Sequence, residues 1–210
     1  YDQSLWLWSK FEKPYSTVTF NLDLTDRFRP IMIPISVLYW FSENERVILI
    51  FQAVVLGAAV FPIWLVAKSS LPWILAIVVA FLYLDFIGIG ATAVFDFHEM
   101  ALLPLFLGWL FYFLSRGMWR SYFVTLFLSL SVREHVGFLL ATLGFYVFVV
   151  FKNLKVALFT SFISLAWSIA AIAVIMPMLG QNYYASFVEK DDTLGQAILS
   201  YLKNPLFAVE

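Results

Sequence analysis

Long apolar runs separated by short charged turns constrain this chain more than any other feature of its sequence. Two of them, Leu71 to Ala93 and Met100 to Leu114, contain neither lysine nor arginine and flank the charged hexapeptide Val-Phe-Asp-Phe-His-Glu at residues 94–99. Only 13% of the residues are charged and 62% are hydrophobic, whereas a soluble domain carries roughly a quarter charged residues. A soluble core does not need so much apolar surface, so we expect lipid to be the solvent of most of the chain.

Charge and cysteine content exclude several classes of function. The net charge of −1 gives no reason to expect a nucleic acid as partner. Because the chain has no cysteine, disulfides and cysteine-based zinc sites are excluded. The first thirty residues hold no apolar run, so no signal peptide is predicted in them. The chain begins without methionine and ends in a polar segment, and we interpret it as a fragment of a longer protein.

The apolar runs predict an all-α, polytopic transmembrane bundle. Six crossings are expected, at residues 47–67, 71–93, 100–114, 121–132, 136–151 and 156–179. The run Ile31 to Phe41 is too short to cross a bilayer and contains Pro34, so a short re-entrant or interfacial helix is predicted there. The chain is then one transmembrane domain, with an outer loop at 1–46, a membrane core at 47–179 and an outer polar tail at 180–210.

The charged residues sort to the two sides of this map. The only charged residues in the loops assigned to one side are basic: Lys68, Arg116, Arg120, Lys152 and Lys155. The positive-inside rule makes that side cytoplasmic. The first loop, the Asp96 turn and the C-terminal tail then face outward from a cell membrane. Asp85 is the one acid well inside a span, and it can be a structural acid bonded to a neighbouring helix.

The hairpin around Arg133-Glu134-His135 is unusually short. Ser121 to Val132 rises only about 18 Å as a helix, against a hydrocarbon core of about 30 Å. We therefore expect the trio to lie below the outer surface, where an arginine needs charged partners. The available partners lie in the preceding outer turn, so one outward-facing pocket is predicted to hold Asp96, His98, Glu99, Arg133 and Glu134.

Three groups of ionisable residues are expected on the outer side. They are Asp2 with Asp23, Asp26, Arg27 and Arg29; Asp96 with His98 and Glu99; and Arg133 with Glu134 and His135. Such acids and histidines can bind a divalent cation through oxygen and imidazole. They can equally supply a general base while an arginine neutralises a phosphate. No complete metal-ligand, phosphate-loop or dinucleotide motif accompanies them.

Each group also has an interpretation without a function. Asp2 and Asp23 can be solvated loop acids, and Arg29 can anchor the short helix at the lipid headgroups. The pair at 191–192, two aspartates in the tail, is typical of a solvated turn. The hexapeptide 94–99 can be charged simply because it reaches water.

Several islands of sequence resemble, in the same order, the polytopic prokaryotic proteins grouped as domain of unknown function 2079. The islands are Asp2-Gln3-Ser4-Leu5-Trp6, Asp26-Arg27-Phe28-Arg29-Pro30, the stretch 52–68 ending Phe-Pro-Ile-Trp-Leu-Val-Ala-Lys, Asp96-Phe97-His98-Glu99, Arg133-Glu134-His135 and Val174-Ile175-Met176-Pro177. The resemblance covers nearly the whole chain. The sequence departs from the family pattern at Arg27, Met100 and His135.

The layout of that family is similar to that of the GT-C membrane glycosyltransferases. By this resemblance Asp2 would be the catalytic base, and Asp96 and Glu99 the acids of the second outer loop. The residues assigned to the substrate and its lipid phosphate are Asp26, Arg27, Arg29, His98, Arg133, Glu134 and His135. A divalent cation, Mg²⁺ or Mn²⁺, is the candidate cofactor, with Asp96, His98 and Glu99 as its candidate ligands.

The function predicted first is therefore transfer of a sugar from a polyprenyl-phosphate donor to an acceptor outside the cell, with the lipid bilayer and the polyprenyl-phosphate sugar as partners. The alternative is a transporter or permease in which Asp96, Glu99, Glu134 and His135 relay protons or bind a solute. A third interpretation is a non-enzymatic lipid-binding or assembly scaffold. The one-sided acids and the lack of an internal repeat favour the enzyme over the transporter.

Overall fold

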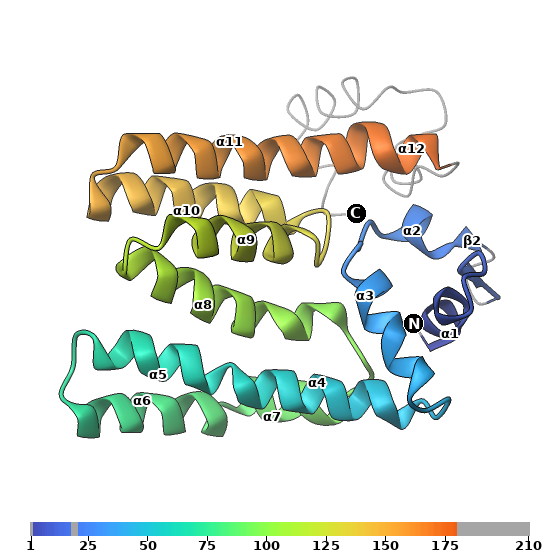
Figure 1. Cartoon of the computed structure of the whole chain (residues 1–210), viewed down its shortest axis with the longest axis horizontal. Coiled ribbons are helices and arrows are strands. Elements are labelled where there is room, and N and C mark those ends of the chain that lie inside the picture. The colour runs from blue at the N-terminus through green and yellow to red at the C-terminus, as the bar shows by residue number, and fades with distance from the viewer. Residues whose placement is uncertain (1, 18–20, 180–210) are drawn as a thin grey trace, which may run out of the picture.

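The computed structural model describes residues 2–17 and 21–179, and this part of the chain is mostly helical. Its long helical segments lie side by side along the long axis of the molecule (Figure 1). In chain order they are α4 (Arg46–Ala58) with α5 (Val60–Lys68), α6 (Trp73–Asp85) with α7 (Ile87–Val94), η2 (Glu99–Leu102) with α8 (Leu103–Ser115), α9 (Trp119–Leu130), α10 (Val136–Phe151), and α11 (Leu154–Ala170) with the π-helix η3 (Ala171–Ile175) and α12 (Met176–Met178).

A group of short elements gathers at one end of this bundle, opposite the turns that follow α5, α8 and α10 (Figure 1). The group consists of α1 (Asp2–Ser9), the antiparallel strands β1 (Tyr15–Ser16) and β2 (Asn21–Leu22), α2 (Asp23–Asp26), α3 (Met32–Ser36) and the 3₁₀-helix η1 (Val37–Trp40). Short helices thus form where the sequence predicts one, at residues 31–41. The predicted tail at 180–210 lies outside the described residues.

Two continuous helices are long and apolar enough to cross a membrane, namely Arg46–Lys68 and Leu154–Met178. The bent pair α6 and α7 makes a third candidate if it counts as one span. The segments Glu99–Ser115 and Val136–Phe151 are apolar but shorter. The prediction of an all-α membrane protein is confirmed, with two or three candidate spans among the described residues, whereas the six crossings remain a prediction.

The second expected crossing is not one straight helix. It is bent by 46° between α6 and α7, where Phe86 has an extended backbone with φ −63° and ψ 119°. The sequence that follows, Ile-Gly-Ile-Gly at 87–90, combines β-branched residues with glycines, both of which weaken a helix. Asp85 ends α6 at this bend with its side chain exposed, so the interpretation of Asp85 as a buried structural acid is wrong for the described part of the chain.

The helices α10 and α11 lie so close together at Gly137 and Gly144 that no side chain larger than that of glycine would fit there. A methyl group at Gly137 would collide with the carbonyl oxygen of Ser164, and one at Gly144 with the hydroxyl of Ser161. Small residues at such positions let two backbones approach, which is the usual basis of helix pairing in membranes. The bounds of α10 are those of the predicted run, Val136 to Phe151.

The interior of the bundle is filled from α8, α9 and α10, whereas large apolar side chains cover the outside. The buried side chains include Leu110, Leu114, Tyr122, Leu126, Leu130 and Leu140. On the outside, Phe81 and Leu82 of α6 and Phe162 of α11 are more than half exposed. Exposed side chains of this kind are a liability in water but pack well against lipid tails.

Candidate functional site

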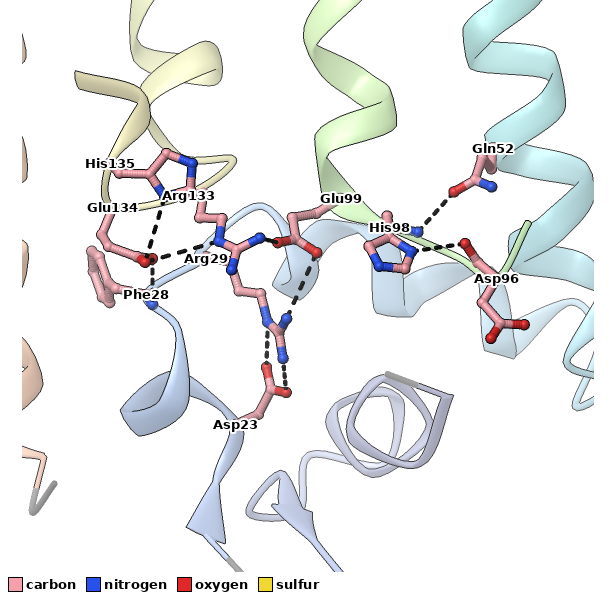
Figure 2. A network of polar contacts seen from close by, with 10 residues as sticks. All are labelled: Asp23, Phe28, Arg29, Gln52, Asp96, His98, Glu99, Arg133, Glu134 and His135. Carbon is pink, nitrogen blue, oxygen red and sulfur yellow. Dashed lines mark hydrogen bonds and ion pairs between the residues drawn. The ribbon is translucent and has the colours of Figure 1, made fainter. Parts of the chain in front are cut away.

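Ionisable residues from three distant parts of the sequence meet at the end of the bundle that the short elements cover (Figure 2). Asp23 begins α2 and Arg29 follows it before α3, Glu99 begins η2, and the turn between α9 and α10 supplies residues 133–135. We call these residues the charge cluster: Asp23, Arg29, Glu99, Arg133, Glu134 and His135.

Glu99 lies between the two arginines of the cluster. Its carboxylate oxygens are 3.6 Å from Nη1 of Arg29 and 3.4 Å from Nη1 of Arg133. The side chain of Glu99 is 0% exposed, and neither of its oxygens accepts a hydrogen bond. Arg29 is held more tightly on its other side, where Nε lies 3.1 Å from Asp23 and Nη2 also donates to that carboxylate. The cluster thus pairs buried charges that would be costly alone.

Glu134 connects the cluster to the chain before α3. Its side chain is also 0% exposed, and its Oε2 accepts a hydrogen bond of 3.0 Å from the backbone N–H of Phe28. The other oxygen is 3.9 Å from Nε of Arg133 and 3.7 Å from Nδ1 of His135. Removing this carboxylate would affect both the arginine and a buried backbone donor.

Two interpretations of the outer loop as a merely wet surface are wrong. Asp23 is 4% exposed, so it is not a solvated loop acid. Arg29 is buried as well, so it does not anchor the short helix at the headgroups. Asp23 and Arg29 carry opposite charges, and their pairing lowers the energetic cost of burying each of them.

Asp96 does not join Glu99, although only two residues separate them. Figure 2 shows Glu99 pointing toward the arginines and Asp96 pointing away from them. Asp96 and Phe97 instead line a cavity of about 300 Å³, together with Asp2, Glu45, Ile48 and Leu49. We call this the outer cavity. It brings together three acids that lie far apart in the sequence, Asp2, Glu45 and Asp96.

The single pocket expected for Asp96, His98, Glu99, Arg133 and Glu134 is therefore not formed. Glu99, Arg133 and Glu134 come together and are largely buried, whereas Asp96 and His98 lie elsewhere. The backbone at His98 is extended, with φ −135° and ψ 127°, and an extended chain sends neighbouring side chains to opposite sides. Among the described residues no three histidine or acidic side chains are placed to hold a metal ion, so Asp96, His98 and Glu99 do not converge as ligands.

Asp2 has a well-defined partner in the outer cavity region. The hydroxyl of Tyr39 donates a hydrogen bond to Oδ1 of Asp2. Burial, and next the hydrogen bond to Asp2, raise the pKa of the Tyr39 phenol above its ordinary value. Tyr39 therefore stays protonated and can hold the Asp2 carboxylate in one orientation.

Gln52 is a residue of the site that the sequence interpretation missed. It is completely buried; its Nε2 donates to the backbone oxygens of Thr92 and Phe95 at 2.8 and 3.2 Å. Its Oε1 accepts from the backbone N–H of His98 at 2.8 Å (Figure 2). These bonds fix the turn that carries Asp96. A signal existed, because Gln52 is the one amide in the apolar run 47–67, and polar groups at membrane depth need partners.

The remaining predicted residues are placed as follows. Arg27 is half-buried and has contacts of its own. His135 is the most exposed member of the charge cluster, at 46%. The side chain of Asp26 and the aspartates at 191–192 lie outside the part of the chain that can be described.

Comparison with known proteins gives one match. A family model described as "Predicted membrane protein (DUF2079)" matches residues 1–207. Neither the curated proteins nor the solved structures contain a match to the chain.

Proposed function

The chain belongs to the DUF2079 family of predicted membrane proteins, and from this premise we propose that it is a membrane-embedded glycosyltransferase of GT-C type. It moves a sugar from a polyprenyl-phosphate donor to an acceptor outside the cell. The observation that carries the proposal is the outer cavity, because Asp2 and Asp96 both line it. Its volume of about 300 Å³ is at the lower end of the range of roughly 300–1,000 Å³ for ligand sites.

The two aspartates have different roles in this proposal. A general base must come within hydrogen-bond reach of the proton that it removes. Asp2 is exposed and oriented by Tyr39, so it takes the proton from the acceptor hydroxyl. Asp96, which is also exposed and lines the same cavity, accepts hydrogen bonds from the acceptor and holds it in place. Glu99 has no catalytic role here, since it is buried between arginines.

The three arginines of this region also have different roles. Arg29 is buried and engaged with Asp23 and Glu99, so we assign it to holding the outer segment on the bundle. Arg27 and Arg133 are partly exposed, and they remain the candidates for the phosphate of the donor. A guanidinium binds phosphate oxygens with paired N–H groups.

The proposal also includes six crossings of the membrane by the helical segments. The helical segments run back and forth between the two ends of the molecule (Figure 1). The turns at the end away from the charge cluster hold or adjoin all five basic residues that the sequence sorts to one side, and the positive-inside rule makes that end cytoplasmic. The outer cavity then faces away from the cytoplasm.

A transfer assay in membranes tests this function. Asp2→Asn and Asp96→Asn keep the size of each side chain but remove its negative charge. We expect Asp2→Asn to lower the transfer rate by about 10²–10⁴-fold, the usual contribution of a general base, with expression unchanged. Glu43→Gln is the matched control, because Glu43 is exposed and paired with Lys10 outside the cavity. Transfer that survives in both aspartate variants would rule the proposal out.

A transporter is the second candidate, and one observation favours it. Glu99 is fully buried and its oxygens accept no hydrogen bond, and a buried acid in a membrane protein is a candidate for a proton or solute pathway. Proton uptake into vesicles containing the protein tests this alternative. Uptake that is abolished by Glu99→Gln and unaffected by Asp2→Asn would favour the transporter over the transferase.

A further inference from the structure

A second cavity lies on the other side of the Asp96 turn. It has a volume of about 430 Å³ and is lined by α4, α7, the turn 95–98, η2 and the start of α8. Apart from Thr92 and His98 its lining side chains are apolar: Leu56, Ile89, Ala91, Phe95, Met100, Ala101 and Pro104. We call it the apolar cavity.

The apolar cavity has two polar side chains in its lining, Thr92 and His98. The hydroxyl of Thr92 donates to the backbone oxygen of Gly88 within its own helix, at 2.7 Å, so it presents little polarity. His98 lies in the turn, where its Nδ1 is 2.9 Å from the backbone oxygen of Asp96. A ligand here would therefore meet mostly hydrocarbon, with one imidazole as its main polar contact.

One short turn separates the two cavities. Phe95 and His98 face the apolar cavity, while Asp96 and Phe97 face the outer cavity. Gln52 fixes this partition through its bonds to Phe95 and His98. A molecule lying across the turn would thus have an apolar part on one side and a polar part beside the acids on the other.

The surroundings of the apolar cavity belong to the membrane. Leu56 is part of the spanning helix 46–68. Ala91 and Phe95 are exposed at the cavity, and neighbouring Ile87 and Val94 of α7 are 84% and 88% exposed. An apolar hollow that is open at this depth meets lipid chains rather than water.

We propose that the apolar cavity binds the hydrocarbon chain of the lipid donor, with the donor's phosphate at His98 rather than at Arg27 or Arg133, neither of which lines the cavity, and with its sugar beside Asp2 and Asp96. The inference rests on the proposed transferase and specifies how it holds its donor. Nδ1 of His98 donates to the backbone oxygen of Asp96, so it is the imidazolium form, in which Nε2 also carries a proton, that would donate to a phosphate oxygen. The three acids of the outer cavity repel a phosphate but accept hydrogen bonds from sugar hydroxyls, so the phosphate stays at the turn.

Photolabelling of the whole chain in phosphatidylcholine nanodiscs tests the site. The probe is a prenyl phosphate that carries a diazirine on its chain, and labelled peptides are identified by mass spectrometry. We expect labels within residues 89–104. Ala91→Trp fills the cavity and should reduce labelling by about tenfold, which corresponds to about 1.4 kcal/mol. Val78→Trp on the exposed face of α6, outside the cavity, is the control and should label like the wild type.

The phosphate position is tested with the matching prenyl alcohol. His98→Ala should lower labelling by the phosphate probe to the level of the alcohol probe and leave the alcohol unaffected. Undiminished labelling of Ala91→Trp overturns the inference, as does equal labelling of the same peptides by a diazirine fatty acid. The proposed transferase activity is refuted by a different result. If the cavity is labelled but Asp2→Asn still transfers sugar at the full rate, the lipid site stands and the proposed enzyme does not.

Discussion

Glu134→Ala should be the most damaging single substitution in the charge cluster. The carboxylate is completely buried, receives the N–H of Phe28 and faces Arg133 and His135. Its removal leaves a buried backbone donor unsatisfied, at a cost of about 1–3 kcal/mol. The substitution also removes one of the two carboxylates that contact Arg133. Breaking a fully buried ion pair costs about 3–5 kcal/mol; because Arg133 is 19% exposed and keeps its contact with Glu99, its share of the loss is only about 2 kcal/mol.

We therefore expect Glu134→Ala to lower the free energy of unfolding by about 3–5 kcal/mol. For a chain of this size each kcal/mol shifts the melting temperature by roughly 2–4 °C, so the expected fall is roughly 6–20 °C. Thermal melts of the detergent-solubilised protein measure it. The melting temperature of Glu134→Gln should lie between those of the wild type and of Glu134→Ala, because the amide oxygen still accepts the hydrogen bond from Phe28 while the charge is lost.

The control for this experiment is Glu43→Ala. Glu43 is 67% exposed and paired with Lys10 at the surface, and such pairs contribute about 0–1 kcal/mol. If Glu134→Ala melts within a degree or so of Glu43→Ala, the charge cluster does not hold the outer segment on the bundle and the reasoning from its burial is refuted.

Three further predictions concern packing, pH and topology. Gly144→Val should separate α10 from α11 and destabilise the protein by about 1–3 kcal/mol, while Gly57→Val, where an added Cβ meets nothing, should cost less than half of that in the same melts. The pKa of Tyr39 is raised in the folded protein, so the contribution of this residue to stability is complete below the ordinary tyrosine pKa of about 10 and is lost as the pH rises further. The wild type should therefore lose more stability between pH 9 and 11 than Tyr39→Phe does. Equal losses would contradict the assignment. In intact cells an impermeant maleimide should label a cysteine placed at Glu12 but not one at Ser69, and labelling of both would contradict the proposed sidedness.

The sequence predicted the helices better than it predicted the site. The apolar run at 136–151 coincides with α10 because the turns on both sides of it are strongly polar. The pairing of Arg133 with an acid follows from the shortness of its hairpin, and Glu99 lies 3.4 Å away. Both inferences use local features, namely run length and the cost of a sunken charge.

The division of the acids could not be predicted in the same way. Asp96 and Glu99 are equally charged and nearly adjacent, and only the extended turn held by Gln52 sends them to different places. Asp23 resembles any loop acid until Arg29 is folded against it. Such placements depend on contacts between residues far apart in the sequence, and the composition of the loop does not encode them.

The most direct measurement of the central claim is the single-turnover rate of sugar transfer by the purified Asp2→Asn variant at saturating donor. Asp2 removes the proton in the proposed reaction, whereas the donor is held chiefly through its hydrocarbon chain and phosphate, at other residues. We therefore predict a rate about 10²–10⁴-fold below that of the wild type, with the donor concentration for half-saturation nearly unchanged. A rate within a few-fold of the wild type would show that Asp2 is not the base and would contradict the account.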